Sequence, residues 1–302
     1  MSSTTPSVRL RRAIHFVPGG NEKMLTKALT LPADALILDL EDAVTPPRKA
    51  EVRQEVARWL GSVDFGRQER MVRINPLESP WGRADLDVVM RHPPDCIVLP
   101  KVRALADVDV IDRILTTLEL ERGIAPRSVR LLLVATETPE GVLNIAQTAR
   151  HPRVDAINWG AEDLSAALGA RRNRDARGQY LEVFRYCQSV CLLSAVAAGV
   201  QPIDAVFVDI RDERGLRADC ENGANMGFTG KITIHPSQIA IVNEYFTPNA
   251  TEIADARELV AAFADNERAG RGAFSHRGEM VDMPHLARAR VLLERARQAG
   301  VA

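Results

Sequence analysis

Eight short apolar segments rich in β-branched residues recur along this 302-residue chain, and they restrict its possible folds more than any other feature. Nearly continuous hydrophobic runs of this kind are typical of parallel strands that are buried on both faces of a sheet. Segments with helical spacing separate most of them. The eight runs are AIHFV (13–17), ALILDL (35–40), RMVRIN (70–75), CIVLPK (96–101), RLLLVATE (130–137), AINWG (156–160), DAVFVD (204–209) and KITIHP (231–236).

The helical segments between the strands indicate how the sheet closes. Eight strands with intervening helices are what a (β/α)8 barrel requires. A doubly wound open sheet is the alternative, but no GxGxxG motif follows the first strand. We therefore predict an α/β fold, with a (β/α)8 TIM barrel over residues 1–265 and a C-terminal helical extension, an arm and a helix, over residues 266–302.

Composition excludes several classes of function. The formal net charge of −1 gives no reason to expect nucleic acid or an anionic membrane as a partner. No apolar run is long enough to span a membrane, and the N-terminal MSSTTPSVRLRR lacks the apolar core of a secretory signal. The four cysteines form no CxxC pair, and Cys187 and Cys191 share a helix face, which is typical of buried thiols. We therefore expect a protein of the reducing cytoplasm.

Polar residues, most of them charged, follow the predicted strands. In a (β/α)8 barrel the carboxyl ends of the strands converge on the active site. Carboxylates that face arginine and lysine at that end are typical of a catalytic mouth. In strand order these residues are Asp39, Glu41, Asp42, Arg73, Asn75, Lys101, Glu137, Asp163, Asp209 and His235.

Glu137 and Asp163 are the candidate metal ligands, because they follow the fifth and sixth strands, which are neighbours. Two carboxylates, with water or substrate oxygens completing the coordination, suit Mg²⁺, with Mn²⁺ as an alternative. The six histidines lack ligand spacing, so nothing indicates Zn²⁺. Taken singly, Asp163 also fits a helix cap and Glu137 a surface ion pair. Their position on adjacent strands favours a metal site.

Arg73 lies in an otherwise apolar strand, and its forked guanidinium suits a carboxylate or an enolate oxygen. It also fits as the partner of a barrel acid such as Asp39 or Glu41, and both roles are compatible. Beside a divalent ion, the acids of DLED (39–42) would hold metal-bound waters, which makes Glu41 and Asp42 catalytic candidates.

Three other residues carry weaker signals. His15 and His235 stand alone, and a lone histidine of this kind is more often a hydrogen-bonded structural residue than a catalyst. Lys231 follows a glycine-flanked turn in GFTGKITIHPSQ (227–238), where other barrels often bind phosphate, but the segment lacks P-loop spacing.

Eight motifs, taken in order, resemble the citrate lyase β-subunit and malyl-CoA lyase family of the HpcH/HpaI aldolase superfamily. The resemblance implies a (β/α)8 enzyme that cleaves or forms a carbon–carbon bond in 3-hydroxyacyl thioesters, usually of CoA. Any one motif is weak, but their common order along most of the chain is specific. They are FVPGG (16–20), ILDLEDAV (37–44), VRIN (72–75), VLPKV (98–102), ETPEG (137–141), NWGAEDLSAALG (158–169), MGFTGKITIHPSQ (226–238) and GEMVDMP (278–284).

Mapped by motif, the resemblance implies that Glu137 and Asp163 hold Mg²⁺ and that Arg73 stabilises the enolate of the acyl thioester. The bound ion would chelate the hydroxyl and carboxylate oxygens of a malyl-type substrate. Backbone amides at the start of a helix would meet the substrate carboxylate. The residues so implicated in substrate or CoA binding are Arg12, Arg73, Lys101, Gly160, Ala161, Glu162, Ile234 and Pro236.

The chain departs from related patterns at two points. Aldolases that take free 2-keto acids carry a histidine base in an EH pair, where this chain has Glu41–Asp42, and this favours the thioester lyases. At the first strand the family often has Arg-Ser, whereas this chain has RRAIHF (11–16). Arg12 keeps a charge for the CoA phosphates, but the hydroxyl is missing.

Asp282 follows the glycine- and arginine-rich RAGRGAFSHRG (268–278), which we interpret as a flexible arm. One interpretation is that Asp282, just ahead of Pro284, starts the last helix. The other, implied by the resemblance, is that Asp282 is the acid that protonates the enolate. A mobile C-terminal lid would then deliver it onto a neighbouring subunit of a homotrimer or hexamer.

The leading hypothesis is a Mg²⁺-dependent lyase of malyl-CoA or citramalyl-CoA type substrates. It would give acetyl-CoA, or a related acyl-CoA, plus glyoxylate or pyruvate as the small 2-oxo acid. Two alternatives stay open: a malate-synthase-like condensing thioesterase, and a citrate lyase β subunit that acts on an acyl-carrier-protein thioester.

Overall fold

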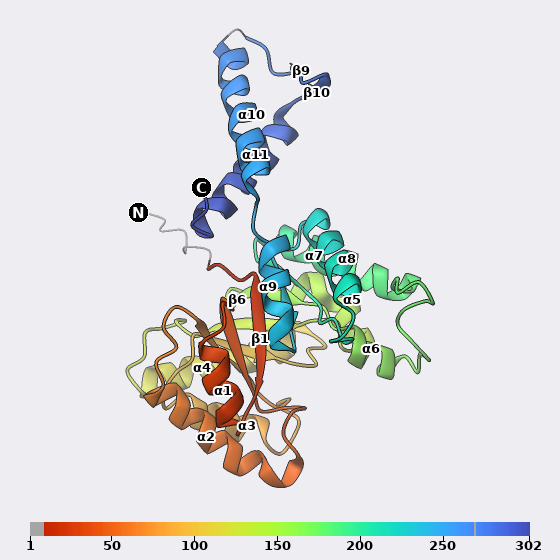
Figure 1. Ribbon diagram of the computed structural model, residues 1–302. Coiled ribbons are helices and arrows are strands. Elements are labelled where there is room, and N and C mark those ends of the chain that lie inside the picture. The colour runs from red at the N-terminus through yellow and green to blue at the C-terminus, as the bar shows by residue number, and fades with distance from the viewer. Residues whose placement is uncertain (1–8, 269) are drawn as a thin grey trace. The chain divides into compact units, whose positions relative to one another are not determined.

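The computed structural model describes residues 9–268 and 270–302, which divide into two compact units, one over Arg11–Asn243 and one that contains Glu244–Ala302. In the first unit, eight parallel strands pair in sequence order and close into a barrel, with β1 hydrogen-bonded to β8. Helices cover the outside of the strands (Figure 1). The predicted (β/α)8 fold is confirmed.

The barrel follows a regular alternation of strand and helix. Its strands are β1 (Ala13–Pro18), β2 (Ala35–Asp39), β3 (Glu69–Arg73), β4 (Cys96–Leu99), β5 (Arg130–Val134), β6 (Val154–Asn158), β7 (Gln201–Asp204) and β8 (Gly230–Thr233). Its helices are α1 (Glu22–Leu29), the short 3₁₀ helix η1 (Pro46–Arg48), α2 (Lys49–Ser62), α3 (Gly82–Val89), α4 (Leu105–Glu121), α5 (Pro139–Thr148), α6 (Ala161–Ala167), α7 (Glu182–Ala198), α8 (Glu213–Met226) and α9 (Pro236–Tyr245).

Aliphatic side chains from the strands fill the barrel interior, as their nearly continuous hydrophobicity predicts. They include Ile14, Ile37, Met71, Val98, Leu132, Ile203 and Ile232. Arg11 lies ahead of β1, at the amino end of the strands, and is almost fully buried. It forms paired hydrogen bonds with Glu69 and contacts Asp155 and Gln201, so its buried charge is compensated. The amino end of the barrel is therefore held by structural ion pairs.

The seventh strand differs from its prediction. The apolar run DAVFVD (204–209) predicted a strand, whereas β7 covers Gln201–Asp204, and the chain leaves the sheet after Asp204. Ala205 and Phe207 are buried by packing outside the strand, which explains the misleading apolar pattern. Asp209, predicted at a strand end, consequently lies in an exposed loop.

The second unit contains two helices and a hairpin: α10 (Ala250–Arg268), β9 (Phe274–His276), β10 (Glu279–Val281) and α11 (Met283–Gln298). The two helices lie side by side with the hairpin at one end (Figure 1). Phe263, Val281 and Leu286 form the small core that joins these elements. All of α10 groups with α11, so the contacts divide the chain near Glu244 rather than at the predicted boundary, residue 265.

The arm predicted to be flexible, residues 268–278, contains β9 and the turn of this hairpin. β9 and β10 pair through a two-residue turn, in which Arg277 and Gly278 have φ angles of 50° and 87°. Positive φ at both positions is the signature of a type I′ turn, which matches the twist of a hairpin. A sequence of glycine and arginine therefore encodes a tight turn here as well as a polar surface.

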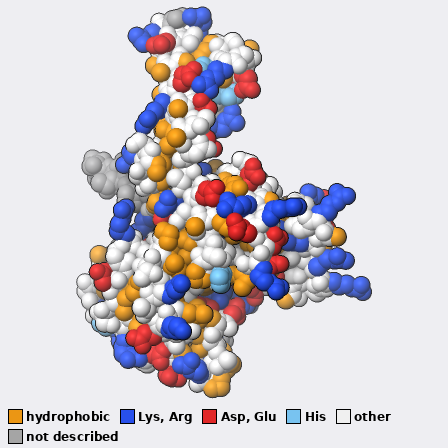
Figure 2. All heavy atoms as spheres, viewed as in Figure 1, with side chains coloured by type: hydrophobic (Ala, Val, Ile, Leu, Met, Phe, Trp, Pro, Cys, Tyr) orange, Lys and Arg blue, Asp and Glu red, His pale blue; other side chains and the backbone are white. Residues whose placement is uncertain are grey.

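The structure also bears on the cysteines, on the possibility of a membrane-spanning helix and on the charges at the surface. The four cysteines are buried, as predicted for Cys187 and Cys191. Over the described ranges, no helix combines the length and the hydrophobicity that crossing a membrane requires. On the face in Figure 2, basic side chains gather at the edge formed by the segment between α6 and α7, which carries Arg171, Arg172, Arg174 and Arg177.

Candidate functional site

Charged side chains from five consecutive strand ends meet at the carboxyl end of the barrel. Each follows or ends a strand from β2 to β6, so the closed sheet fixes their relative positions. Residues that are up to 122 positions apart in sequence, such as Glu41 and Asp163, thereby come within reach of one lysine. This mouth cluster comprises Asp39, Glu41, Asp42, Arg73, Lys101, Glu137 and Asp163.

Arg73 is held rigidly by Asp39. Its Nε and Nη2 donate to the two carboxylate oxygens of Asp39 at 2.7 Å each. Asp39 in turn accepts hydrogen bonds from the backbone N–H groups of Glu41 and Ala43. Burial disfavours the guanidinium charge, but the hydrogen bonds and charge of Asp39 outweigh it and raise the pKa of Arg73. The sequence-based pairing of Arg73 with a barrel acid is confirmed, and Nη1 still faces Glu41 and Asp42 at 3.1 and 3.6 Å.

Glu41 lies between the two cations of the cluster. Its Oε1 accepts from Nζ of Lys101 at 2.5 Å, whereas its buried Oε2 has no hydrogen-bond partner, although Arg73 is near. Burial raises the pKa of Glu41, against the opposing effects of Arg73 and Lys101. Lys49 donates to the backbone carbonyls of residues 40 and 41, which holds this acidic loop in place. Glu41 therefore offers an oxygen that can accept a proton or a hydrogen bond from a ligand.

Glu137 is the most perturbed carboxyl of the cluster. Its Oε2 accepts a 2.6 Å hydrogen bond from the backbone N–H of Lys101, and the residue is 4% exposed. Burial first, and then the charges of Asp163 and Glu41, raise the pKa of Glu137 to about 8. A Cβ at Gly160 would lie 3.0 Å from Cγ of Glu137, so glycine allows the carboxylate to pack against the start of α6.

Glu137 and Asp163 fit a hard divalent cation. The charge of Asp163 raises the pKa of Glu137, and a cation between the two carboxylates would relieve that repulsion. Among the described residues, no group of three or more His, Cys, Asp and Glu side chains forms a complete metal site. Mg²⁺ suits such an incomplete set, because it usually binds one or two carboxylates and keeps several waters or substrate oxygens.

The predicted carboxylate-binding amides lie beside this pair. The backbone N–H of Gly160 already donates to Oγ1 of Thr136 at 2.9 Å. The prediction therefore rests on Ala161 and Glu162, which begin α6. The side chain of Glu162 accepts a hydrogen bond from Asn173 and so points to the segment between α6 and α7.

Ile234 and Pro236 line a groove of about 1020 Å³ between the ends of β1 and β8 and helix α1. Phe16 lines the same groove, and the guanidinium of Arg73 lies 4.6 Å from its ring centroid, so the groove leads to the mouth cluster. Lys23 and Lys27, one helical turn apart on α1, also line it. Sequence analysis missed Phe16 and both lysines; the i, i+4 lysine spacing was the available signal.

Two predicted anion contacts are not brought to the mouth cluster. Arg12 precedes β1, at the amino end of the barrel, and forms paired hydrogen bonds with Asp34. This placement does not favour the contact with CoA phosphates predicted for it. Lys231 is 1% exposed and binds Asp204 and Asp219, so the candidate phosphate site there is wrong: the ammonium neutralises two buried acids.

The two histidines have structural surroundings. His15 is buried and hydrogen-bonded to Oγ1 of Thr233, and burial lowers its pKa to about 4, which keeps it neutral. His235 is exposed and contacts Ser237 at the start of α9. Both agree with the interpretation of lone histidines as hydrogen-bonded residues.

Asp282 belongs to the second unit, where it is the N-cap of α11, with Pro284 in the first turn. The helix-starting interpretation is thus confirmed as geometry. Its Oδ1 lies 2.6 Å from Nδ1 of His285, and its side chain is about half exposed. Sequence analysis missed His285 as a partner, although its position three residues after the N-cap is the usual place for one.

Comparison with known proteins gives consistent matches over almost the whole chain. Residues 12–236 match the family model described as HpcH/HpaI aldolase/citrate lyase. A (3S)-malyl-CoA thioesterase of Cereibacter sphaeroides (strain KD131 / KCTC 12085) is 38% identical over 285 residues, which cover 94% of each chain. A mitochondrial citramalyl-CoA lyase of Rattus norvegicus is 38% identical over 291 residues, 92% of this chain and 84% of that protein.

A solved structure agrees with these matches. The crystal structure of protein CitE from Mycobacterium tuberculosis, in complex with magnesium, acetoacetate and coenzyme A, superimposes with a TM-score of 0.79. The two proteins are 34% identical, and the match covers 95% of this chain and 98% of that one. The likeness therefore extends over the barrel and most of the second unit.

Proposed function

Because the chain belongs to the HpcH/HpaI aldolase/citrate lyase family, and is thus an enzyme of a carbon–carbon lyase family, we propose that it is a Mg²⁺-dependent lyase of a 3-hydroxyacyl-CoA thioester. The substrate is of the malyl-CoA or citramalyl-CoA type, and the products are an acyl-CoA and glyoxylate or pyruvate. One observation carries the proposal: Lys101 contacts Glu137, Asp163 and Glu41, and Glu41 in turn lies 3.1 Å from Arg73.

In this proposal the mouth cluster divides the chemistry among fixed groups. Glu137 and Asp163 would hold Mg²⁺, with Mn²⁺ as a substitute, and the bound ion supplies Lewis acidity that lowers the pKa of the substrate hydroxyl. Oε2 of Glu41, buried and without a hydrogen-bond partner, accepts the hydroxyl proton. When the carbon–carbon bond breaks, the electron pair passes to the acyl thioester as an enolate, and the guanidinium of Arg73 would stabilise that charge.

The released enolate needs a proton, and Asp282 is the proposed acid. The carboxylates of the mouth cluster are engaged with Arg73, with Lys101 or in the proposed metal site, whereas Asp282 is half exposed and contacts only its neighbour His285 among the interactions described. Delivery of Asp282 by the second unit of a neighbouring subunit, in a homotrimer or hexamer, stays part of the proposal. A cytoplasmic location stays a prediction.

The groove beside α1 supports a CoA thioester rather than a free acid. Its volume, about 1020 Å³, exceeds the need of a four- or five-carbon acid alone. Its wall combines apolar residues, such as Phe16 and Ile234, with Lys23 and Lys27. That combination suits a long, partly apolar arm that carries phosphates, and the groove reaches Arg73 through Phe16.

A second function has a specific observation in its favour. The malyl-CoA thioesterase of Cereibacter sphaeroides matches 94% of this chain with 38% identity, as closely as the lyase does. The same mouth cluster would then precede hydrolysis of a malyl-type thioester, alone or after condensation of an acyl-CoA with a 2-oxo acid. The third reading, a citrate lyase β subunit that uses an acyl-carrier-protein thioester, is not favoured by the CitE structure, because that structure contains coenzyme A.

A single assay separates these functions. Purified full-length protein is incubated with Mg²⁺ and, separately, with malyl-, methylmalyl-, citramalyl- and citryl-CoA. Release of a 2-oxo acid is followed as its hydrazone, and free CoA thiol is followed with a disulfide reagent. A lyase releases 2-oxo acid and acyl-CoA without free thiol, whereas a thioesterase releases thiol and a diacid.

The outcomes bear directly on the proposal. Cleavage of one malyl- or citramalyl-type ester, lost on chelation and restored by Mg²⁺, supports the lyase. Thiol release without 2-oxo acid overturns it in favour of the thioesterase. Activity only on a thioester of an acyl carrier protein overturns it in favour of the citrate lyase subunit.

A further inference from the structure

We propose that Lys101 is the positioning residue of the metal site. The backbone of Lys101 holds the ligand Glu137 in place, and its ammonium occupies the site until a divalent cation enters. This inference rests on the proposed metal-binding function and adds a role to it. Lys101 contacts both proposed ligands: its backbone N–H donates to Oε2 of Glu137 at 2.6 Å, and its Nζ lies 3.5 Å from Oδ1 of Asp163.

The backbone of Lys101 adopts an unfavourable conformation at this point. Its φ angle is 53°, in the left-handed region that residues with a Cβ rarely occupy. Such conformations persist where packing fixes them, and they concentrate at functional sites. Here Leu99 and Val102 are buried on either side, and a Cβ at Gly141 would come within 2.3 Å of the carbonyl oxygen of Val102. The segment is therefore clamped against α5, and the left-handed turn aims the N–H at Glu137.

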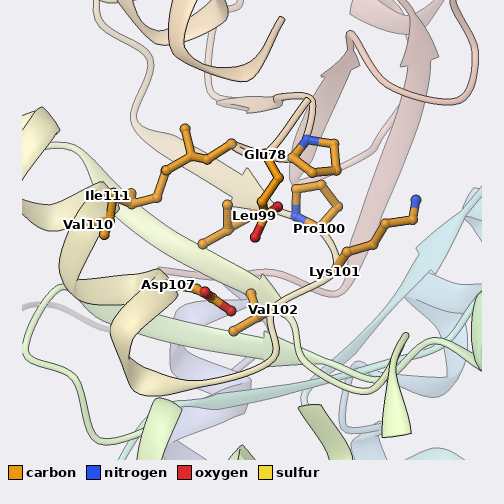
Figure 3. Close-up of a pocket in the computed structure, with 10 residues that line it drawn as sticks. Glu78, Leu99, Pro100, Lys101, Val102, Asp107, Val110 and Ile111 are labelled. Carbon is orange, nitrogen blue, oxygen red and sulfur yellow. The ribbon is translucent and has the colours of Figure 1, made fainter. Parts of the chain in front are cut away.

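The side chain of Lys101 extends to the other side of this segment. Figure 3 shows a pocket of about 220 Å³ lined by Leu99, Val110 and Ile111, and the side chain of Lys101 points away from these residues. Its Nζ instead reaches Glu41 at 2.5 Å, Asp163 at 3.5 Å and Asp42 at 4.0 Å. The ammonium thus lies among three carboxylates of the mouth cluster.

The charges of the cluster explain why an ammonium occupies this place. Arg73 is committed to the acids that follow β2, so Lys101 is the cation in contact with Asp163. A lysine ammonium is charged at neutral pH, and Nζ of Lys101 donates to Oε1 of Glu41 at 2.5 Å. Without it, Asp163 would lose its contact with a cation, and its repulsion of Glu137 would be less compensated.

A divalent cation at Asp163 would meet this ammonium as a like charge. The ammonium must then withdraw towards Glu41 and Asp42, which it also contacts. Lys101 consequently lowers the affinity for the ion while its backbone keeps Glu137 in place. The two effects have opposite signs, so substitutions that separate them give opposite changes.

Three variants separate the effects in the full-length chain, with Mn²⁺ alone as the probe and its affinity measured by electron paramagnetic resonance. Lys101→Gly removes the ammonium and tolerates the left-handed turn, so Mn²⁺ should bind about three- to tenfold more tightly than to the wild type. Lys101→Ala removes the ammonium but disfavours the turn, and should bind roughly tenfold more weakly than Lys101→Gly. Lys101→Arg keeps a charge and should bind Mn²⁺ with nearly wild-type affinity.

Arg127→Gly is the matched control. Arg127 also has a left-handed backbone, with φ of 56°, but it precedes β5 at the amino end of the barrel and contacts Asp112. Its replacement removes a positive charge and relieves the same kind of strain away from the mouth cluster, so Mn²⁺ affinity should not change. Melting temperatures of all variants without metal show whether each one folds.

Two results would overturn the inference. If folded Lys101→Gly binds Mn²⁺ no more tightly than the wild type, the ammonium does not hold the place of the ion. If Lys101→Ala and Lys101→Gly bind equally, the left-handed turn does not position Glu137. Failure of the wild type itself to bind Mn²⁺ would instead contradict the proposed function, and this is how the two failures are told apart.

Discussion

The mouth cluster of the barrel and the segment around Asp282 carry acids of two different kinds. Glu137 is almost fully buried, is fixed by the backbone of Lys101 from another strand end, and has a strongly raised pKa. Asp282 is half exposed and is held by His285, three residues away. The barrel thus creates its chemistry by bringing distant charges together, whereas the C-terminal unit carries an acid whose proposed use depends on delivery to a site.

Replacing a proposed ligand tests the first half of this comparison and should have the largest effect. Asp163→Ala should abolish both the retention of Mg²⁺ and turnover, because it removes one of the two proposed protein ligands and its negative charge. Metal content after equilibrium dialysis and the rate of 2-oxo acid release measure the two losses.

Glu140→Gln is the control for this variant. Glu140 is an exposed acid in the first turn of α5, as Asp163 is an acid in the first turn of α6. The control should retain metal and activity. Full activity of Asp163→Ala would remove Asp163 from the metal site and leave it as an acid in the first turn of α6.

Asp282→Asn tests the second half of the comparison, and its effect should be confined to the chemical step. Loss of a positioned acid typically costs about 10²- to 10⁴-fold in rate, so turnover should fall within that range while metal and substrate affinity stay unchanged. Asparagine caps a helix about as well as aspartate, so α11 and the melting temperature should be preserved. Single-turnover rates and Mn²⁺ titrations give the two quantities.

Glu279→Gln, in the same hairpin, is the matched control, because it removes an exposed carboxylate three residues before Asp282. It should leave turnover near the wild-type rate. Near-normal turnover of Asp282→Asn would mean that Asp282 does no more than start α11, and the contrast between the two regions would lose its functional meaning.

The sequence predicted the barrel and the residues of its mouth because strand ends are specified locally. An apolar run followed by a polar residue marks each end, and the closure of eight strands then places Glu41, Arg73, Lys101 and Glu137 together. The same local pattern failed at β7, where buried packing of Phe207 outside the sheet imitates a strand. A hydrophobic pattern in the sequence indicates that side chains are buried, and side chains can be buried without belonging to a strand of the sheet.

Pairings between distant residues could not be predicted in the same way. Nothing near Lys231 in sequence shows that Asp204 and Asp219 neutralise it, and nothing near Arg12 shows its place at the amino end of the barrel beside Asp34. Both lysine and arginine were interpreted as anion sites from charge alone. The left-handed backbone of Lys101 is likewise set by packing against α5, which only the fold supplies.

The pH dependence of metal binding gives the smallest and most specific test of the comparison. Burial and the charges of Asp163 and Glu41 raise the pKa of Glu137 from 4.5 to about 8, so the metal-free folded protein holds a proton there that the unfolded chain has lost. The stability this proton contributes is fully present below pH 4.5 and is lost as the pH rises through about 8. A divalent ion must displace the same proton, so affinity should fall about tenfold for each pH unit below that value.

Mn²⁺ titrations from about pH 6 to 9 measure this slope, because one competing proton gives a tenfold change per pH unit. The profile should flatten above about pH 8, where Glu137 is ionised before the ion arrives. Asp282→Asn should give the same profile, since the acid of the C-terminal unit takes no part in holding the ion. A profile that is flat across the whole range would show that Glu137 is already ionised at pH 6. The burial of Glu137 beside Asp163 would then be compensated in solution, and burial would not distinguish the acids of the mouth cluster from Asp282.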